Sequence, residues 1–107
     1  MTLTPMGRVN VTTPGTPVAL STDPTQRVTR LFFQSVPGST GKTYIGKPGM
    51  SKSTLSGVAR VLAPNPSGVA DQFLVEADDA TDKINMVEYA IDADVAGEGL
   101  LISYWTE

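Results

Sequence analysis

The sequence predicts an all-β fold: a single-domain β-sandwich or small barrel of seven or eight short antiparallel strands in a jelly-roll-like arrangement. Ten Gly and eight Pro among 107 residues indicate frequent turns. Apolar and polar residues alternate within short runs, which is the period of a half-buried strand. These runs recur at nearly regular spacing along the whole chain. Frequent turns between short alternating runs are typical of sandwiches and barrels.

The first two expected strands are short and separated by a Thr-Pro-Gly turn. Arg8–Thr12 alternates, with Val9 and Val11 on one face. Thr16–Leu20 contains Pro17, which has no amide hydrogen to donate. We therefore expect this second strand at a sheet edge, or Pro17 at its beginning.

Arg27–Val36 is the clearest strand in the first half of the chain. Alternation separates two faces: one holds Leu31, Phe33 and Ser35, and the other holds Val28, Arg30, Phe32 and Gln34. Apolar residues on both faces predict a central strand, or one whose outer face a partner subunit covers.

Three further strands are expected in the middle of the chain, at Lys42–Gly46, Val58–Leu62 and Val69–Glu76. The last of these fits two patterns. Phe73 and Val75 alternate as in a strand, whereas four-residue steps through this segment also fit one face of a helix. We favour a strand because the flanking segments are strands.

The last two expected strands are Ile84–Asp92 and Leu100–Trp105. Alternation in the first places three side chains toward the core: Val87, Tyr89 and Ile91. In the final strand it places Leu100, Ile102 and Tyr104 on one face, and Leu101, Ser103 and Trp105 on the other.

The domain organisation that we expect is simple. Residues 1–7 form a flexible N-terminal arm, and residues 8–107 form one β-sandwich domain. The N-terminus has no apolar segment behind a basic start, so it does not resemble a signal peptide. No apolar run approaches the length that crosses a bilayer, and we expect no membrane association.

Charge is distributed very unevenly along the chain. Residues 1–60 hold seven of the eight basic residues and one acid, whereas residues 61–107 hold ten of the eleven acids and one base. Their net charges are +6 and −9. Either early and late segments lie side by side and neutralise each other, or the molecule is polar and meets copies of itself or a charged partner. We favour the first interpretation. The overall charge of −3 argues against general binding to nucleic acid.

The composition removes most catalytic chemistry. The chain has no Cys and no His, and so lacks the usual thiolate nucleophile, the commonest general base and the commonest transition-metal ligand. We therefore expect no enzymatic activity, no catalytic residues, no cofactor, no metal and no small-molecule substrate.

One segment, Gly38-Ser39-Thr40-Gly41-Lys42-Thr43, looks like a phosphate-binding loop. The motif requires an earlier Gly where this chain has Val36, and it requires a helix after the Lys. The chain continues instead as an expected strand. We therefore interpret the segment as a solvated hairpin loop.

Two acidic clusters and a set of aromatic residues are candidate binding sites. Neither acidic cluster has the spacing of a calcium loop, and solvated loops are the expected outcome. The aromatic residues offer either a sugar-stacking platform or core contacts, with Trp105 as the most exposed anchor. The clusters are Asp78, Asp79 and Asp82, and Asp92, Asp94 and Glu98; the aromatic residues are Tyr44, Tyr89, Tyr104 and Trp105.

Several short motifs occur in an order that resembles small β-sandwich structural proteins of tailed bacteriophages, including capsid decoration, or cement, proteins. The resemblance runs from Arg27 to Tyr104 and departs from the family at Pro64-Asn65-Pro66, where a Pro-Gly turn is usual. Its motifs are Lys42–Gly46, Val58–Pro64, Tyr89–Asp92 and Gly97–Tyr104.

The resemblance implies a virion structural protein, made in the host cytoplasm, that decorates the capsid surface. It implies binding to the major capsid protein and assembly as a homotrimer. The alternatives are a receptor- or carbohydrate-binding module of a head fibre or tail, and a component of the tail or head-tail junction. From the strand patterns, Trp105, Phe32 and Leu101 are the interface candidates, because each falls on the face opposite the expected core.

Overall fold

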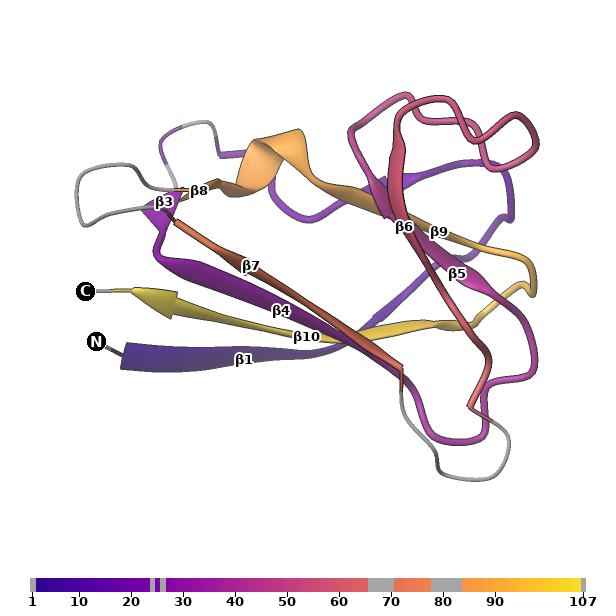
Figure 1. Cartoon of the computed structure of the whole chain (residues 1–107), viewed down its shortest axis with the longest axis horizontal. Coiled ribbons are helices and arrows are strands. Elements are labelled where there is room, and N and C mark those ends of the chain that lie inside the picture. The colour runs from indigo at the N-terminus through magenta and orange to yellow at the C-terminus, as the bar shows by residue number, and fades with distance from the viewer. Residues whose placement is uncertain (1, 24, 26, 66–70, 78–83, 107) are drawn as a thin grey trace.

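Two four-stranded antiparallel sheets face each other in the computed structural model, which describes residues 2–23, 25, 27–65, 71–77 and 84–106 (Figure 1). The all-β expectation is confirmed. Sheet A consists, in spatial order, of β1 (Thr2–Asn10), β10 (Gly99–Thr106), β4 (Arg30–Ser35) and β7 (Gln72–Glu76). Sheet B consists of β2 (Val18–Ala19), β9 (Ala90–Ala93), β5 (Thr43–Gly46) and β6 (Val58–Leu62).

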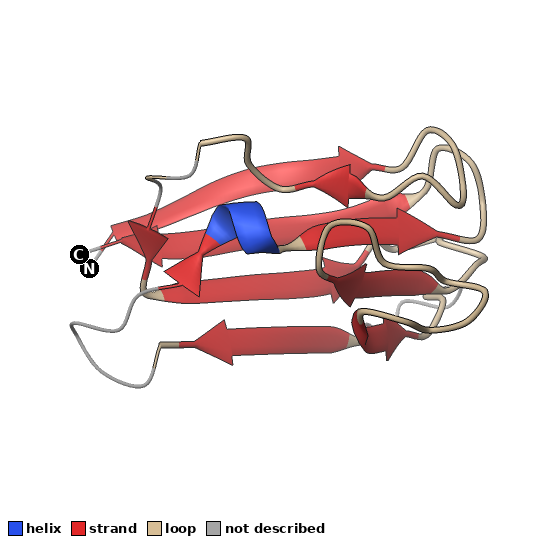
Figure 2. Cartoon of the chain, turned by 90° about the horizontal axis from the view of Figure 1, so that it is seen from above, coloured by secondary structure: helices blue, strands red, loops and turns tan. Residues whose placement is uncertain are grey.

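A smaller unit extends one end of the sandwich. It contains the strand pair β3 (Arg27–Val28) and β8 (Ile84–Asn85), followed by the 3₁₀ helix η1 (Met86–Glu88). Val28 and Met86 are fully buried there, so this unit adds to the core beyond the ends of sheet B. Seen from above, the strands of the two main sheets run nearly along one direction, as in an aligned sandwich (Figure 2).

The eight strands of the main sheets pair in a nested order, which makes the fold a jelly roll. The first pairs with the last (β1 and β10), the second with the seventh (β2 and β9), the third with the sixth (β4 and β7), and the fourth with the fifth (β5 and β6). Two further pairings, β10 with β4 and β5 with β9, join these four ribbons into the two sheets.

The core lies between the two sheets and is apolar. Its largest fully buried side chain is Phe33, whose ring lies 6.1 Å from that of Phe73 and 6.5 Å from that of Tyr89, measured between centroids. Sheet A contributes Leu31, Phe33, Leu100 and Ile102, and sheet B contributes Ile45, Leu62, Ile91 and Ala93. Burial of this apolar surface is the main stabilising contribution to such a fold.

Most of the strand assignments made from the alternating pattern are confirmed. Val58–Leu62 has the expected bounds. Residues 69 and 70 of the ambiguous Val69–Glu76 segment lie outside the described residues, and its described part contains the strand β7. The faces of β4 and β10 are also as expected: Leu31 and Phe33 are buried, whereas Phe32 is partly exposed. The period-two pattern was therefore sufficient to separate the core face from the outer face in these strands. The single strand predicted over Arg27–Val36, however, divides into β3 and β4, and Val28, which was expected on the face of Phe32, is fully buried.

The single strand predicted over Ile84–Asp92 is wrong. The segment divides into β8, η1 and β9, because the Asn85 side chain accepts a hydrogen bond from the Val87 amide and begins a 3₁₀ turn. The turn lets the chain change partners, since β8 pairs with β3 and β9 pairs with β2 and β5. As a result Met86, rather than Val87, is the fully buried side chain.

The flexible arm predicted over residues 1–7 also needs correction. Residues 2–7 belong to β1, which pairs with β10 from Thr2 opposite Thr106 onward. A bulge between Pro5 and Gly7 interrupts this pairing, and the positive φ of Gly7 suits that irregular backbone. The segment is therefore an edge strand of the sheet, and both termini lie at the same end of the molecule (Figures 1 and 2).

Adjacent phenylalanines on opposite faces of β4 provide a test of this architecture. Phe33→Ala is expected to lower the free energy of unfolding by about 3–5 kcal/mol, because it leaves a cavity between the sheets. Phe32→Ala is expected to lower it by less than about 1 kcal/mol, because that side chain points away from the core. Urea denaturation in dilute solution measures both. Equal losses would contradict the assignment of the two faces.

Candidate protein interaction surface

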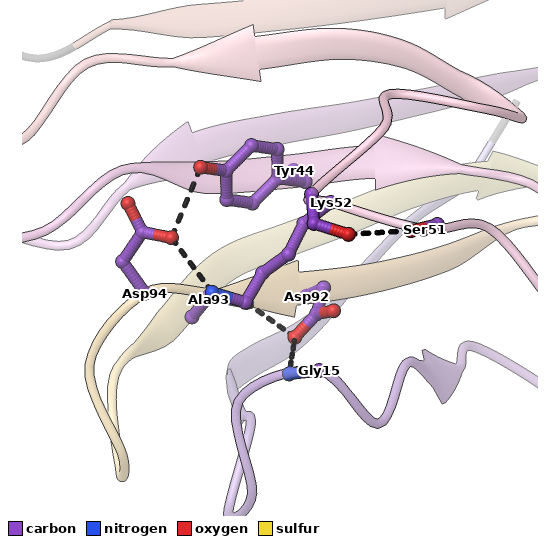
Figure 3. A network of polar contacts seen from close by, with 8 residues as sticks. Gly15, Tyr44, Ser51, Lys52, Asp92, Ala93 and Asp94 are labelled. Atoms are coloured by element: carbon purple, nitrogen blue, oxygen red, sulfur yellow. Dashed lines mark hydrogen bonds and ion pairs between the residues drawn. The ribbon is translucent and has the colours of Figure 1, made fainter.

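The outer face of sheet B is covered by the molecule's own loops. Ala90 and Asp92 point away from the core, yet each is only 1% exposed. Gly15, in the connection between β1 and β2, donates its amide to Asp92 Oδ1 at 3.0 Å. This contact holds that connection against the sheet (Figure 3).

A second connection is tied to sheet B through Asp94. Lys52 lies between β5 and β6, and its Nζ donates to Asp94 Oδ1 at 3.0 Å. The Tyr44 hydroxyl donates to the same oxygen at 3.0 Å (Figure 3). Partial burial acts to raise the pKa of Asp94, but the hydrogen bonds from Lys52 and Tyr44 outweigh it and hold the pKa below its ordinary value. Burial, followed by contact with Asp94, raises the pKa of Tyr44.

The outer face of sheet A, by contrast, is bare. No described strand or helix lies on the side of sheet A that faces away from sheet B (Figure 1). The strand registers arrange the outward side chains of this face in three rows across β1, β10, β4 and β7. Half of these twelve positions are apolar.

The middle row of the outer face of sheet A is the most apolar. It runs from Pro5 through Ser103 and Phe32 to Leu74. Leu74 is 44% exposed, and Phe32 is partly exposed beside it. A large exposed leucine next to a phenylalanine on an uncovered sheet face is an unfavourable arrangement in water unless another surface covers it.

The row nearest the termini combines apolar and charged side chains. Leu3, which is 50% exposed, lies opposite Trp105, and Trp105 lies opposite Arg30. Arg30 in turn lies opposite Glu76 and forms an ion pair with it, at 3.8 Å between Nε and Oε2. One end of this row is therefore apolar and the other carries a neutralised pair.

The third row runs from Arg8 through Leu101 and Gln34 to Gln72. Arg8 bends away from the row's centre, because its side chain donates to Asn10 Oδ1 at 2.6 Å and to the Gly97 carbonyl at 3.1 Å. The interface candidates Phe32, Leu101 and Trp105 thus lie on one continuous surface, one in each row.

Sequence reasoning missed two exposed members of this surface. Leu3 lies in the segment predicted as a flexible arm, and its pairing opposite Trp105 joins distant parts of the chain, which no local pattern specifies. Leu74 could have been found, because the alternation that places Phe73 and Val75 inward places Leu74 outward.

Part of the uneven charge along the sequence is neutralised within the molecule, in the way that the favoured interpretation predicted. The ion pairs between described residues are Arg30–Glu76, Lys52–Asp94 and Arg60–Asp71, and each joins an early base to a late acid. Arg60 also lies 5.8 Å from the centroid of the Phe73 ring, at the edge of the core. Each of these exposed ion pairs contributes about 1 kcal/mol or less to the free energy of unfolding.

The loop that resembles a phosphate-binding motif binds an anion from the chain itself. The amides of Thr40 and Gly41 and the hydroxyl of Thr40 donate to the Glu98 carboxylate at 3.0 to 3.2 Å. Partial burial acts to raise the pKa of Glu98, but these hydrogen bonds outweigh it and keep the pKa below its ordinary value. A strand, β5, follows where the motif requires a helix, and Glu98 already uses the amides that a phosphate would need.

The two acidic clusters have different outcomes. Asp78, Asp79 and Asp82 lie outside the described residues. Asp92, Asp94 and Glu98 bind three different sets of donors from the chain, as described above. Within the described ranges, no three His, Cys, Asp or Glu side chains come together in a way that could hold a metal ion.

The aromatic residues do not form one platform. Tyr44 is buried against Asp94, Tyr104 packs against the core, and Trp105 lies on the outer face of sheet A. Tyr89 lines an open groove of about 610 Å³ between η1 and the β5–β6 end of sheet B. The rest of the groove is formed by Gly46, Lys47, Pro48, Gly57, Ala59, Val87 and Glu88.

Comparison with protein-family models, with curated proteins and with solved structures finds no match for this chain. In the part of the chain that the structure describes, no helix combines the length and apolar character needed to cross a bilayer.

Acid is expected to destabilise the fold. The pKa values of Asp94 and Glu98, and of Asp71, which accepts a hydrogen bond from the Ala63 amide, are lower than their ordinary values of 3.8 to 4.5. The folded state therefore binds fewer protons in acid than the unfolded state does. The stabilisation is fully present above the ordinary values and is lost as the pH falls through the lower folded values. Urea midpoints should be level from pH 7 to about 5 and should fall below about pH 4.

Glu98→Gln tests the contribution of the Glu98 carboxylate to stability. The substitution should lower the free energy of unfolding at pH 7 by about 1–2 kcal/mol, because the glutamine side chain is uncharged and loses the charge-assisted hydrogen bonds. The difference from the unaltered protein should shrink in acid. The exposed Glu88→Gln is the matched control and should change little. A constant difference across the pH range would contradict the role assigned to the Glu98 carboxylate.

Proposed function

We propose that this chain is a structural protein of a bacteriophage virion: a capsid decoration, or cement, protein with no catalytic step. It would bind the major capsid protein through the outer face of sheet A and would reside on the capsid surface after synthesis in the host cytoplasm. Binding to assembled subunits in preference to free ones would stabilise the shell by mass action.

The observation that carries this proposal is the contrast between the two outer faces. Sheet B buries Ala90 and Asp92 beneath the chain's own loops, whereas sheet A leaves Leu3, Leu74 and Trp105 accessible. Contiguous exposed apolar residues mark surfaces that bind other proteins. A surface of this kind, on a chain without Cys or His, supports binding rather than catalysis.

The fold and the motifs give further support. Jelly rolls occur in viral capsid and lectin domains, although a fold alone does not define a function. The motifs that resemble phage structural proteins occupy strands and the turns beside them: Lys42–Gly46 includes β5, Val58–Pro64 includes β6, Tyr89–Asp92 lies largely in β9, and Gly97–Tyr104 lies largely in β10.

The proposal differs in one respect from the mechanism that the sequence suggested. Residues 2–7 are paired within β1, so an arm laid across neighbouring subunits is not part of it. The homotrimer implied by the resemblance would form on the shell, through surfaces other than the outer face of sheet A. Multivalent attachment of several copies would strengthen binding to a repeating lattice.

A receptor- or carbohydrate-binding module is the second candidate function. It is favoured by the groove beside Tyr89, where Lys47 and Glu88 supply a donor and an acceptor. The volume of about 610 Å³ is in the range of small-ligand sites. A component of the tail or head-tail junction would use the same outer face of sheet A with a different virion partner.

Two exposed leucines make a matched test of the first candidate. Leu74 is 44% exposed on the outer face of sheet A, and Leu55 is 54% exposed between β5 and β6. Leu74→Glu should weaken binding to purified expanded phage shells at least tenfold, because it places a charge in the most apolar row of the contact. Leu55→Glu should bind like the unaltered protein. Co-sedimentation with shells measures both.

Co-sedimentation with shells, together with a glycan panel, separates the decoration protein from the carbohydrate-binding module. Saturable binding to shells with no binding to a glycan panel supports decoration. Glycan binding that Tyr89→Ala removes, without shell binding, would support the carbohydrate module instead. Equal shell binding by the two leucine variants would contradict the assignment of the outer face of sheet A.

A further inference from the structure

We propose that, in the free protein, the outer face of sheet A is covered by the same face of a second copy, related by a two-fold axis that crosses the strands at the middle row. This inference rests on the surface used in the proposed function and concerns its regulation. The dimer and the shell would compete for one surface, so that only a dissociated copy binds the shell.

The size of the outer face of sheet A suits a weak, reversible dimer. The four strands hold nine, eight, six and five residues, and at about 3.4 Å per residue and 4.8 Å between strands they cover roughly 460 Å². Two copies would therefore bury about 900 Å², which is in the range of weak, transient interfaces. Such a dimer would dissociate on dilution or in the presence of a better partner.

The arrangement of the rows favours this two-fold axis. Rotation about it places the middle row against itself, so Phe32 meets Phe32 and Leu74 meets Leu74. It also places the row nearest the termini against the third row, so Trp105 meets Leu101, and the reciprocal contact forms on the other side. Sheets packed face to face interdigitate such side chains at about 10 Å separation.

The charges are compatible with the same axis. The Arg30–Glu76 pair of one copy would face Gln34 and Gln72 of the other, because these residues share strands β4 and β7. Side-chain amides both donate and accept, so they can bond to either member of the pair. No like charges would oppose each other, and the only other charged residue on the face, Arg8, would lie at the rim opposite Leu3.

An axis parallel to the strands is less favourable. It would place Glu76 over Leu3 and Phe32 over Ser103, which buries a charge against an apolar side chain and separates the two phenylalanines. The axis across the strands places each apolar residue of the middle row against its own counterpart, whereas the axis parallel to the strands keeps only the apolar contact between Pro5 and Leu74. The register of the sheet therefore favours the axis across the strands.

Light scattering over a range of protein concentrations tests the association. The unaltered protein should rise from its chain mass of 11.3 kDa toward twice that value as its concentration increases. Leu74→Glu should weaken dimerisation at least tenfold, because two carboxylates would meet at the interface. Leu55→Glu should dimerise like the unaltered protein, since it lies between β5 and β6.

Cross-linking tests the geometry. The chain has no Cys, so a single engineered thiol provides one attachment point. Ser103→Cys lies on the middle row and should be joined to its counterpart by a short bis-maleimide reagent. Gln72→Cys lies on the same face, but the axis separates it from its counterpart by about four residues along the strand, roughly 14 Å, so it should react far less.

A strict monomer at all concentrations would overturn this inference. A trimer would also overturn it. So would a dimer that Leu74→Glu does not weaken and in which Ser103→Cys is not cross-linked to its counterpart. If the monomer still binds shells and Leu74→Glu removes that binding, the proposed function stands and the dimer alone fails. If the dimer forms as described but no shell is bound, the proposed function fails and the dimer stands.

Discussion

A β-sheet has two faces, and a sandwich of two sheets buries only one face of each in its core. Whether the other two faces are covered or exposed decides which apolar side chains are accessible to other molecules. Sheet B has short strands and long connections, and its outer face is covered by segments held through Asp92 and Asp94. Sheet A has the long strands β1 and β10, and no described element crosses its outer face. The exposed outer face of sheet A is therefore a consequence of how chain length is divided between strands and connections.

The nested order of the jelly roll also explains the distribution of charge. Because the first strand pairs with the last and the third with the sixth, early segments lie beside late ones. Basic residues in the first half and acids in the second thus become neighbours, as in Arg30–Glu76 and Arg60–Asp71. Part of the charge split along the sequence is thereby neutralised locally in the fold. The outer face of sheet A then remains nearly neutral, which suits an apolar contact better than electrostatic attachment.

Glu98 shows how the same topology removes a chemical possibility. The Gly-Ser-Thr-Gly-Lys loop precedes β5, and Glu98 precedes β10, so the fold brings a carboxylate to amides 57 and 58 residues away. Those amides are suited to an anion, and the chain supplies its own. A loop with the composition of a phosphate site therefore joins the β4–β5 connection to the β9–β10 connection through hydrogen bonds.

The sequence by itself determined the fold class and which side chains share a face. Alternation separates Phe33 from Phe32 and Ile102 from Leu101, because a period of two is a property of the local backbone. Only the tertiary structure decided which outward residues are covered. Asp92 points outward and is buried by Gly15, 77 residues earlier, whereas Leu74 points outward and stays exposed. The tertiary structure also decided that residues 2–7 form a strand, because their partner lies at the far end of the chain. It likewise decided that a turn begins at Asn85, where the chain changes strand partners. Such outcomes depend on contacts between distant segments, which no local pattern specifies.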